Sequence, residues 1–253
     1  MTRCIMRSFL SLPFLLLTAC GTAQAPKSEF EPTKLITTHF GTAPKGSPPQ
    51  LVWKPSATDA PKYGHLPLGT VITTVDTVLL PSADMSLVFF RTHVSYEPDE
   101  FGSDCDLCED WLSIAVYTRA AGDWTISKFE KWFTKQGVYG VTHKPELVEA
   151  GTVGKLVRVI SSDGEMEHSS TTDHLFGVSG LREALTVTTA SHEVERGGDH
   201  GPVDHASQVE YRFIPSNKEW YDVEVTEADR APVRWVYTPA TGKYAQAARA
   251  STK

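Results

Sequence analysis

A histidine-rich segment from residue 192 to residue 205, reading HEVERGGDHGPVDH, is the first place where residue types and spacing predict chemistry. Neutral imidazole together with carboxylate suits zinc, copper or nickel. The residues that we expect to bind the metal, or in the case of an aspartate to orient a ligand imidazole, are His192, His200, His205, Asp199 and Asp204. We favour a mobile polar loop that joins two strands and keep the metal site as the alternative.

Cys105 and Cys108 form a C-x-x-C pair, for which three chemistries are open. A structural zinc site needs four ligands, so histidines would have to complete it. A reactive dithiol is activated by positive surroundings, whereas this pair lies among carboxylates, which slow thiolate formation. We therefore favour a disulfide that holds a surface loop, and keep redox exchange and metal binding as alternatives.

The same stretch carries seven carboxylates between Glu97 and Asp110. Calcium binds six to eight oxygen ligands, often from carboxylates. The spacing does not fit an EF-hand, because counting from Asp99 puts Phe101 at position 3 and Asp110 at position 12. We expect a solvated acidic loop. The sequence also lacks a Gly-x-Ser-x-Gly elbow and a phosphate-binding glycine loop, so no motif points to nucleophilic or nucleotide chemistry.

Strand signals dominate the chain that would position these residues. The segments that we expect to be strands are 70–80, 86–94, 111–118, 123–131, 155–161, 165–172, 183–191, 207–214, 220–226, 232–237 and a short one near Lys243 and Tyr244. Many short strands separated by turn residues predict an all-β, antiparallel sandwich or barrel-like domain. Two Gly-x-x-Gly blocks, at Gly137 and Gly177, lie 40 residues apart and keep a propeller-like repeat as the alternative.

Two local signals refine this picture. Residues 144–150 (KPELVEA) could form one short helix with Pro145 in its first turn. Asp163-Gly164 is the strongest hairpin-turn cue in the chain.

The N-terminal residues predict export. Arg3 and Arg7 precede an apolar run from Phe9 to Leu17, which is too short to span a bilayer and is typical of a secretory signal. The block Leu17-Thr18-Ala19-Cys20-Gly21 resembles the lipobox of bacterial lipoproteins. The resemblance implies that residues 1–19 are removed and that Cys20 carries a lipid anchor. In lipoproteins of Gram-negative bacteria, the residue after the lipidated cysteine helps to select the membrane. Gly21 in place of aspartate implies that, in a Gram-negative host, the protein is anchored in the outer membrane and faces the periplasm.

These expectations divide the chain into the signal (1–19), the lipidated Cys20 with a flexible tether (20–49), an all-β domain (50–245) and a disordered tail (246–253). The tether assignment rests on a composition rich in Thr, Ala, Pro, Lys and Gly. Removing the signal, which carries two arginines and no acid, takes the net charge from −7 to −9. The acidic net charge argues against nucleic acid as a partner, because a nucleic-acid-binding surface needs lysines and arginines to neutralise phosphates.

The leading functional hypothesis is therefore a membrane-anchored envelope lipoprotein that acts as a non-catalytic binding or structural module, with an envelope protein as a possible partner. The alternative is a metal-binding protein or metal-dependent hydrolase that uses the segment from 192 to 205, which would make a divalent metal its cofactor.

Overall fold

The computed structural model describes residues 30–56, 70–94, 110–137, 143–165, 168–195, 203–228 and 230–247. Within these ranges the protein has one helix, α1 (Pro32–Phe40), and 13 strands. The strands of the first half are β1 (Leu51–Trp53), β2 (Val71–Ser82), β3 (Met85–Val94), β4 (Asp110–Ala120) and β5 (Asp123–Gly137). Those of the second half are β6 (Glu146–Glu149), β7 (Lys155–Glu165), β8 (His168–Gly177), β9 (Glu183–Glu195), β10 (Val203–Ile214), β11 (Asp222–Glu227), β12 (Val233–Thr238) and β13 (Lys243–Gln246). None of the described segments forms a helix long and apolar enough to cross a bilayer.

One hydrogen-bonded path joins the strands in the order of the chain, with β6 paired to β7 beside it. Neighbours are antiparallel except β5 and β7, which pair in parallel through Gly137 and Ser162. This contact requires glycine, because Gly137 has a φ of 145° and a Cβ there would lie 2.7 Å from the carbonyl oxygen of Ser162. The expected all-β, antiparallel, sandwich-like fold is confirmed, and the sheet is open rather than closed into a barrel.

Alternate side chains of β3 and β4 belong to two different cores. Leu87 and Phe89 pack with Leu112 in a core that also contains residues of β7 and β8. Val88 and Phe90 point to the other side and pack against residues of α1. Because side chains alternate along a strand, the sheet formed by β2–β5 is buried on both faces.

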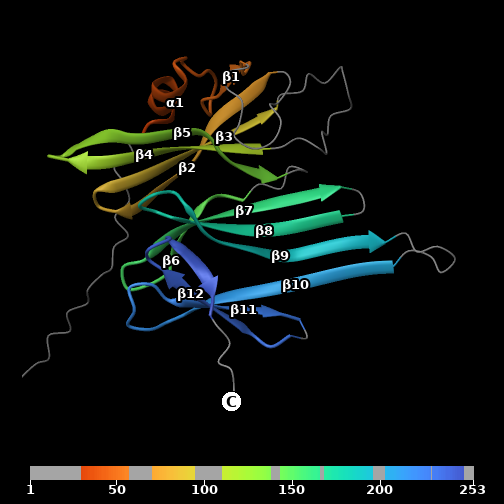
Figure 1. Cartoon of the computed structure of the whole chain (residues 1–253). Coiled ribbons are helices and arrows are strands. Elements are labelled where there is room, and N and C mark those ends of the chain that lie inside the picture. Colours follow the sequence, from red (N-terminus) through yellow and green to blue (C-terminus); the bar gives the residue numbers. More distant parts are fainter. Residues whose placement is uncertain are drawn as a thin grey trace, which may run out of the picture.

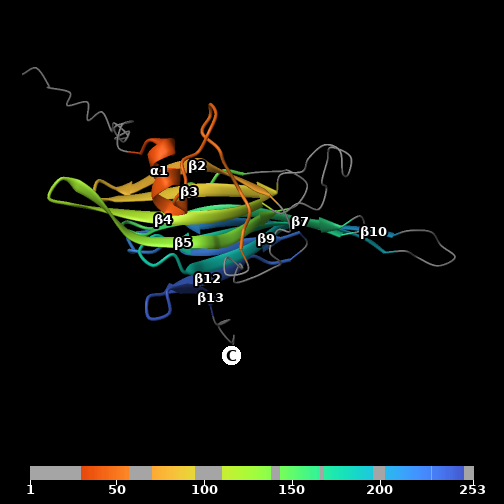
Figure 2. The ribbon, with the colours of Figure 1, turned by 90° about the horizontal axis from the view of Figure 1, so that it is seen from above.

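The strands β7 and β8 are likewise buried on both faces. Val157 and Val159 face the core shared with β3 and β4. Leu156 and Leu175 face a third core, which contains Val223 of β11. The molecule is therefore a stack in which α1, β2–β5, β6–β9 and β10–β13 follow one another, with α1 at one end and β11–β12 at the other (Figure 1). Figure 2 shows α1 lying over the strands β2–β5.

The helix α1 lies inside the segment that was expected to be a flexible tether, so the structure differs from that expectation. The Glu31 carboxylate caps the helix by accepting hydrogen bonds from the backbone N–H groups of Thr33 and Lys34, at 3.1 and 2.9 Å. Gly41 ends it in a left-handed conformation. Composition suggested a tether, but Leu35 and Ile36 are buried against the sheet. Phe30 is buried in the same core, so the folded domain includes residues from Phe30 onward.

Two local expectations in the strands β6–β9, which we call the middle layer, are wrong. Residues 146–149 are a strand, because Leu147 and Val148 must face two different cores, which only an extended backbone allows. Asp163-Gly164 lies within β7 opposite Ser170 and Ser169, and the hairpin closes beyond the pair Glu165 and His168. The buried valines of β7 fix the register of the hairpin, and this outweighs the turn preference of Asp-Gly.

Candidate functional site

The layer formed by β10–β13 turns one continuous apolar face toward the middle layer. Cross-strand pairing puts Val209 opposite Glu227, Val225 opposite Val233, and Trp235 opposite Gln246. Residues paired in this way project from the same face of a sheet. The same face carries Phe213 and Tyr244 farther along, in the third core. Large apolar patches left open on a protein surface mark binding sites in many proteins.

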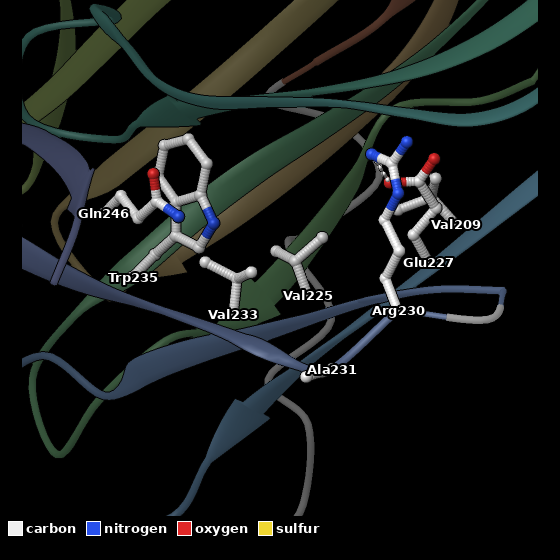
Figure 3. Close-up of a pocket in the computed structure, with 8 residues that line it drawn as sticks. All are labelled: Val209, Val225, Glu227, Arg230, Ala231, Val233, Trp235 and Gln246. Atoms are coloured by element: carbon white, nitrogen blue, oxygen red, sulfur yellow. Dashed lines mark hydrogen bonds and ion pairs between the residues drawn. The ribbon is translucent and has the colours of Figure 1, made fainter. Parts of the chain in front are cut away.

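Protein covers this face completely at one end only, because Val209, Val225 and Trp235 toward the other end are partly buried. At the covered end Val223 is fully buried and Trp220 stacks on Tyr237, with ring centroids 4.0 Å apart. At the other end a cleft of about 460 Å³ remains. The residues that line it are Val209, Val225, Glu227, Arg230, Ala231, Val233, Trp235 and Gln246. We call it the C-terminal cleft, and Figure 3 shows its valines and Trp235 pointing to the same side.

Charged and polar groups stand at the rim of the C-terminal cleft. At one end Arg230 Nη1 lies 2.7 Å from Glu227 Oε2, and this ion pair is exposed (Figure 3). The amide of Gln246 lies at the other end, beside Trp235. A mostly apolar lining with a few polar groups is the usual composition of a small-molecule site, and the volume lies in the range of about 300–1,000 Å³ found for such sites.

A second cavity, of about 520 Å³, shares Val209 with the C-terminal cleft and contains a buried polar cluster. The carboxylate of Asp173, 1% exposed, accepts hydrogen bonds at Oδ2 from Arg158 Nε (2.7 Å) and from the Tyr211 hydroxyl (2.8 Å). Burial and the hydrogen bond to Asp173 both raise the pKa of Tyr211, so its hydroxyl remains a donor. The second oxygen, Asp173 Oδ1, is buried and has no hydrogen-bond partner.

An unpartnered carboxylate oxygen is costly to bury, so it marks a place where a donor would bind favourably. Because the two cavities share Val209, a molecule with an apolar body and a hydroxyl or amine can contact both. Its apolar part would contact the valines of the C-terminal cleft, and its donor would reach toward Asp173.

The residues predicted to bind a metal are not brought together where the structure describes them. His192 pairs with Ala206 across β9 and β10, while His205 pairs with Glu193. The two histidines thus occupy neighbouring register positions and project from opposite faces of the sheet. Within the described ranges no group of three or more His, Cys, Asp or Glu residues could hold a metal ion.

A different row of titratable groups crosses this end of the sheet. His168 of β8 and His205 of β10 both pair with Glu193 of β9, so all three share one face. The distance from His168 Nδ1 to Glu193 Oε1 is 3.7 Å, and both side chains are exposed. Exposed pairs of this kind contribute about 1 kcal/mol or less to stability.

Several predicted residues lie outside the described residues, namely Cys20, Cys105, Cys108, Asp199 and His200. The backbone of Asp204 is described as part of β10, but its side chain is not. Of the predicted acidic loop, Asp110 alone lies in a described range, and its carboxylate lies 3.2 Å from Arg91 Nη1.

Sequence reasoning missed the C-terminal cleft. The alternation of Val209, Tyr211 and Phe213 along β10 was visible, and so was that of Val223 and Val225 along β11. It shows which side chains share a face, but not that the facing layer leaves Val209, Val225 and Trp235 partly exposed. Asp173 gave no signal, because its partners Arg158 and Tyr211 lie 15 and 38 residues away. Searches against protein-family models, curated proteins and solved structures found no match for this chain.

Proposed function

We propose that the protein is a lipid-anchored module of the cell envelope that binds a small amphipathic molecule in the C-terminal cleft. The observation that carries the binding role is the partly covered apolar face of β10–β13, whose cleft shares Val209 with the cavity that Asp173 lines. The sequence from Arg3 to Cys20 carries the proposal of the anchor.

The position of α1 has a consequence for this anchoring. Phe30 is already buried against Tyr117 and Trp124, with ring centroids 5.5 and 5.4 Å apart. Ten residue steps separate it from Cys20, and a fully extended chain of that length reaches about 35 Å. A lipid on Cys20 would therefore keep the folded body close to the membrane surface, where amphipathic molecules are concentrated.

Changing Cys20 to serine is expected to move the protein from the membrane fraction to the soluble fraction, because a thiol is needed to carry the lipid. The measurement is fractionation together with labelling by an alkyne analogue of palmitate in a bacterial host. Cys4→Ser is the matched control and should keep both label and membrane location. An unlabelled wild-type protein, or a labelled Cys20→Ser protein, would contradict the anchor.

Binding in the C-terminal cleft can be measured with N-phenyl-1-naphthylamine, an apolar fluorophore with one N–H donor. We expect its fluorescence to rise on binding to the Cys20→Ser chain, which needs no detergent. Val233→Glu should weaken binding at least tenfold, because a carboxylate in the cleft would be desolvated by the probe.

Val52→Glu is the matched control, since Val52 is 60% exposed on β1 and lies outside the cleft. It should leave the affinity unchanged. Asp173→Asn should weaken binding less than Val233→Glu, because it alters one polar contact and leaves the apolar lining intact. Equal binding by the Val233→Glu and Val52→Glu chains would overturn the proposed site.

A further inference from the structure

A groove separate from the C-terminal cleft and from the Asp173 cavity lies on the other face of the middle layer. It has a volume of about 500 Å³ and runs between β5 and the strands β7 and β8. Its apolar lining includes Phe133, Phe176 and Leu181, which belong to the core between the first two sheet layers. Ser161, His174 and Glu183 also line it, and none of them takes part in the proposed binding role.

Strand pairing brings these three polar residues into one row. Ser161 pairs with Thr172 and His174 pairs with Val159, so Ser161 and His174 are diagonal neighbours on the same face of β7 and β8. A register shift between Leu175 and Phe176 in the pairing of β8 with β9 lies next to Glu183. Irregularities of this kind redirect side chains.

The resulting hydrogen bonds form a continuous chain. Ser161 Oγ lies 2.9 Å from His174 Nε2, and His174 Nδ1 lies 2.7 Å from Glu183 Oε1. An ionised carboxylate can only accept, so Glu183 fixes the proton of the neutral imidazole on Nδ1. His174 Nε2 then carries the lone pair and can accept from the Ser161 hydroxyl, whose other contact, to the Thr172 carbonyl oxygen, is longer at 3.5 Å.

The electrostatics of Glu183 favour this arrangement. Burial alone would raise its pKa, but hydrogen bonds from Thr186 and His174 outweigh burial and hold the pKa below its ordinary value. The carboxylate therefore stays ionised at neutral pH and can stabilise a positive charge on the imidazole. Serine, histidine and a carboxylate with these roles can activate a hydroxyl on unrelated folds, whatever their order in the sequence.

We propose that Ser161 is a nucleophile that accepts the acyl group of small carboxylic esters, with His174 as its general base and Glu183 as a positioning residue. Ser161 Oγ forms a bond to the ester carbonyl carbon while its proton passes to His174 Nε2. The carbon–oxygen bond to the alcohol then breaks, and the alcohol leaves with that proton. Water attacks the acyl-serine in the same way, which releases the acid and restores Ser161.

The groove indicates the class of ester. Phe133, Phe176 and Leu181 provide an apolar wall for a short acyl chain. Lys135 supplies a cation at the groove, with Nζ 3.9 Å from Asp163 Oδ1. The expected substrates are thus neutral esters of short-chain acids, for which p-nitrophenyl acetate is a suitable probe.

The decisive test is covalent labelling of the Cys20→Ser chain by a fluorophosphonate, followed by peptide mass spectrometry. The Ser161 oxygen would displace fluoride from phosphorus, and its proton would pass to His174. We expect one label per chain, on Ser161, with none in the Ser161→Ala chain. Ser162→Ala, which removes the neighbouring hydroxyl of the same groove, is the matched control and should keep the label.

His174→Gln should slow labelling at least a hundredfold, the usual contribution of a general base. Glu183→Gln should slow it at least tenfold while leaving the melting temperature within a few degrees, because the amide oxygen can still accept from Nδ1 but carries no charge. If the His174→Gln chain does not fold, the labelling rate of the Glu183→Gln chain tests the proposal instead. A hydrogen-bonded row with only a structural role would leave Ser161 as unreactive as Ser162, and that result would overturn the proposal.

Hydrolysis of p-nitrophenyl acetate provides the second readout. The acyl-serine step predicts a burst of one p-nitrophenol per chain, absent from Ser161→Ala. Val52→Glu should leave the burst unchanged, because Val52 is exposed on β1 and lines neither the C-terminal cleft nor this groove. If neither the burst nor the fluorophosphonate label is seen, Ser161 is not a nucleophile. That result would leave the proposal of ligand binding in the C-terminal cleft unaffected.

Discussion

Replacing Gly151 with alanine is expected to lower the free energy of unfolding by about 3 kcal/mol. A Cβ at this position would lie 1.7 Å from the carbonyl oxygen of Glu219 and 2.8 Å from the Cα of Trp220. Both are backbone atoms, so the chain itself must move to make room. The measurement is urea unfolding followed by circular dichroism.

The displaced backbone joins the middle layer to the layer that carries the C-terminal cleft. Tyr221 N donates to Ala150 O at 2.7 Å, and Thr152 N donates to Lys218 O at 3.1 Å. Gly180→Ala is the matched control, because its Cβ would approach no atom closer than Arg182 Cγ at 3.8 Å. Equal unfolding curves for the two variants would show that residues 150–154 do not hold the layers together.

Replacing Arg91 with methionine is expected to destabilise the protein by about 3–5 kcal/mol. Arg91 Nε donates to Asp76 Oδ1 at 2.8 Å, and Nη1 donates to Asp110 Oδ2 at 3.2 Å. Nη2 donates to the carbonyl oxygen of His143 at 3.1 Å. Methionine fills a similar volume but leaves two buried carboxylates without their cation, and an uncompensated buried charge is far costlier than a lost surface pair.

The pH dependence separates this cause from lost packing. Burial raises the pKa of Asp110, and Arg91 opposes that rise. Removing Arg91 should therefore raise the pKa of Asp110 further, so the loss of stability should shrink as the pH falls and Asp110 takes up a proton. Lys128→Met is the control, since its pair with Glu130 is exposed and should contribute less than 1 kcal/mol. If the loss of stability in Arg91→Met is independent of pH, the loss comes from packing rather than from the unpaired carboxylates.

Much of the fold could be predicted because strand signals are local. The alternation and β-branched residues of 70–80, 86–94 and 111–118 predicted β2, β3 and β4 within a few residues. The same local signals failed at Asp163-Gly164 and at 144–150, where the register of buried valines and the need to face two cores determine the conformation. Helix α1 has both a cap and a terminal glycine in the sequence, but its polar composition concealed the buried Leu35 and Ile36.

The candidate sites depend on contacts that no local pattern contains. His192 and His205 are close in sequence, yet a single register step puts them on opposite faces. Ser161, His174 and Glu183 are separated by ordinary strand residues, and register together with a bulge aligns them. Sheet pairing has a side-chain period of two, so one step decides whether two groups meet.

The measurement that tests ligand binding most directly is methyl NMR of the Cys20→Ser chain, with labelled valine, during titration with N-phenyl-1-naphthylamine. The proposed function predicts that the methyl signals of Val209, Val225 and Val233 shift together with one affinity, while those of the exposed Val52 stay in place. Shifts confined to other valines, or no saturable shift at all, would contradict the proposal that the C-terminal cleft is the binding site.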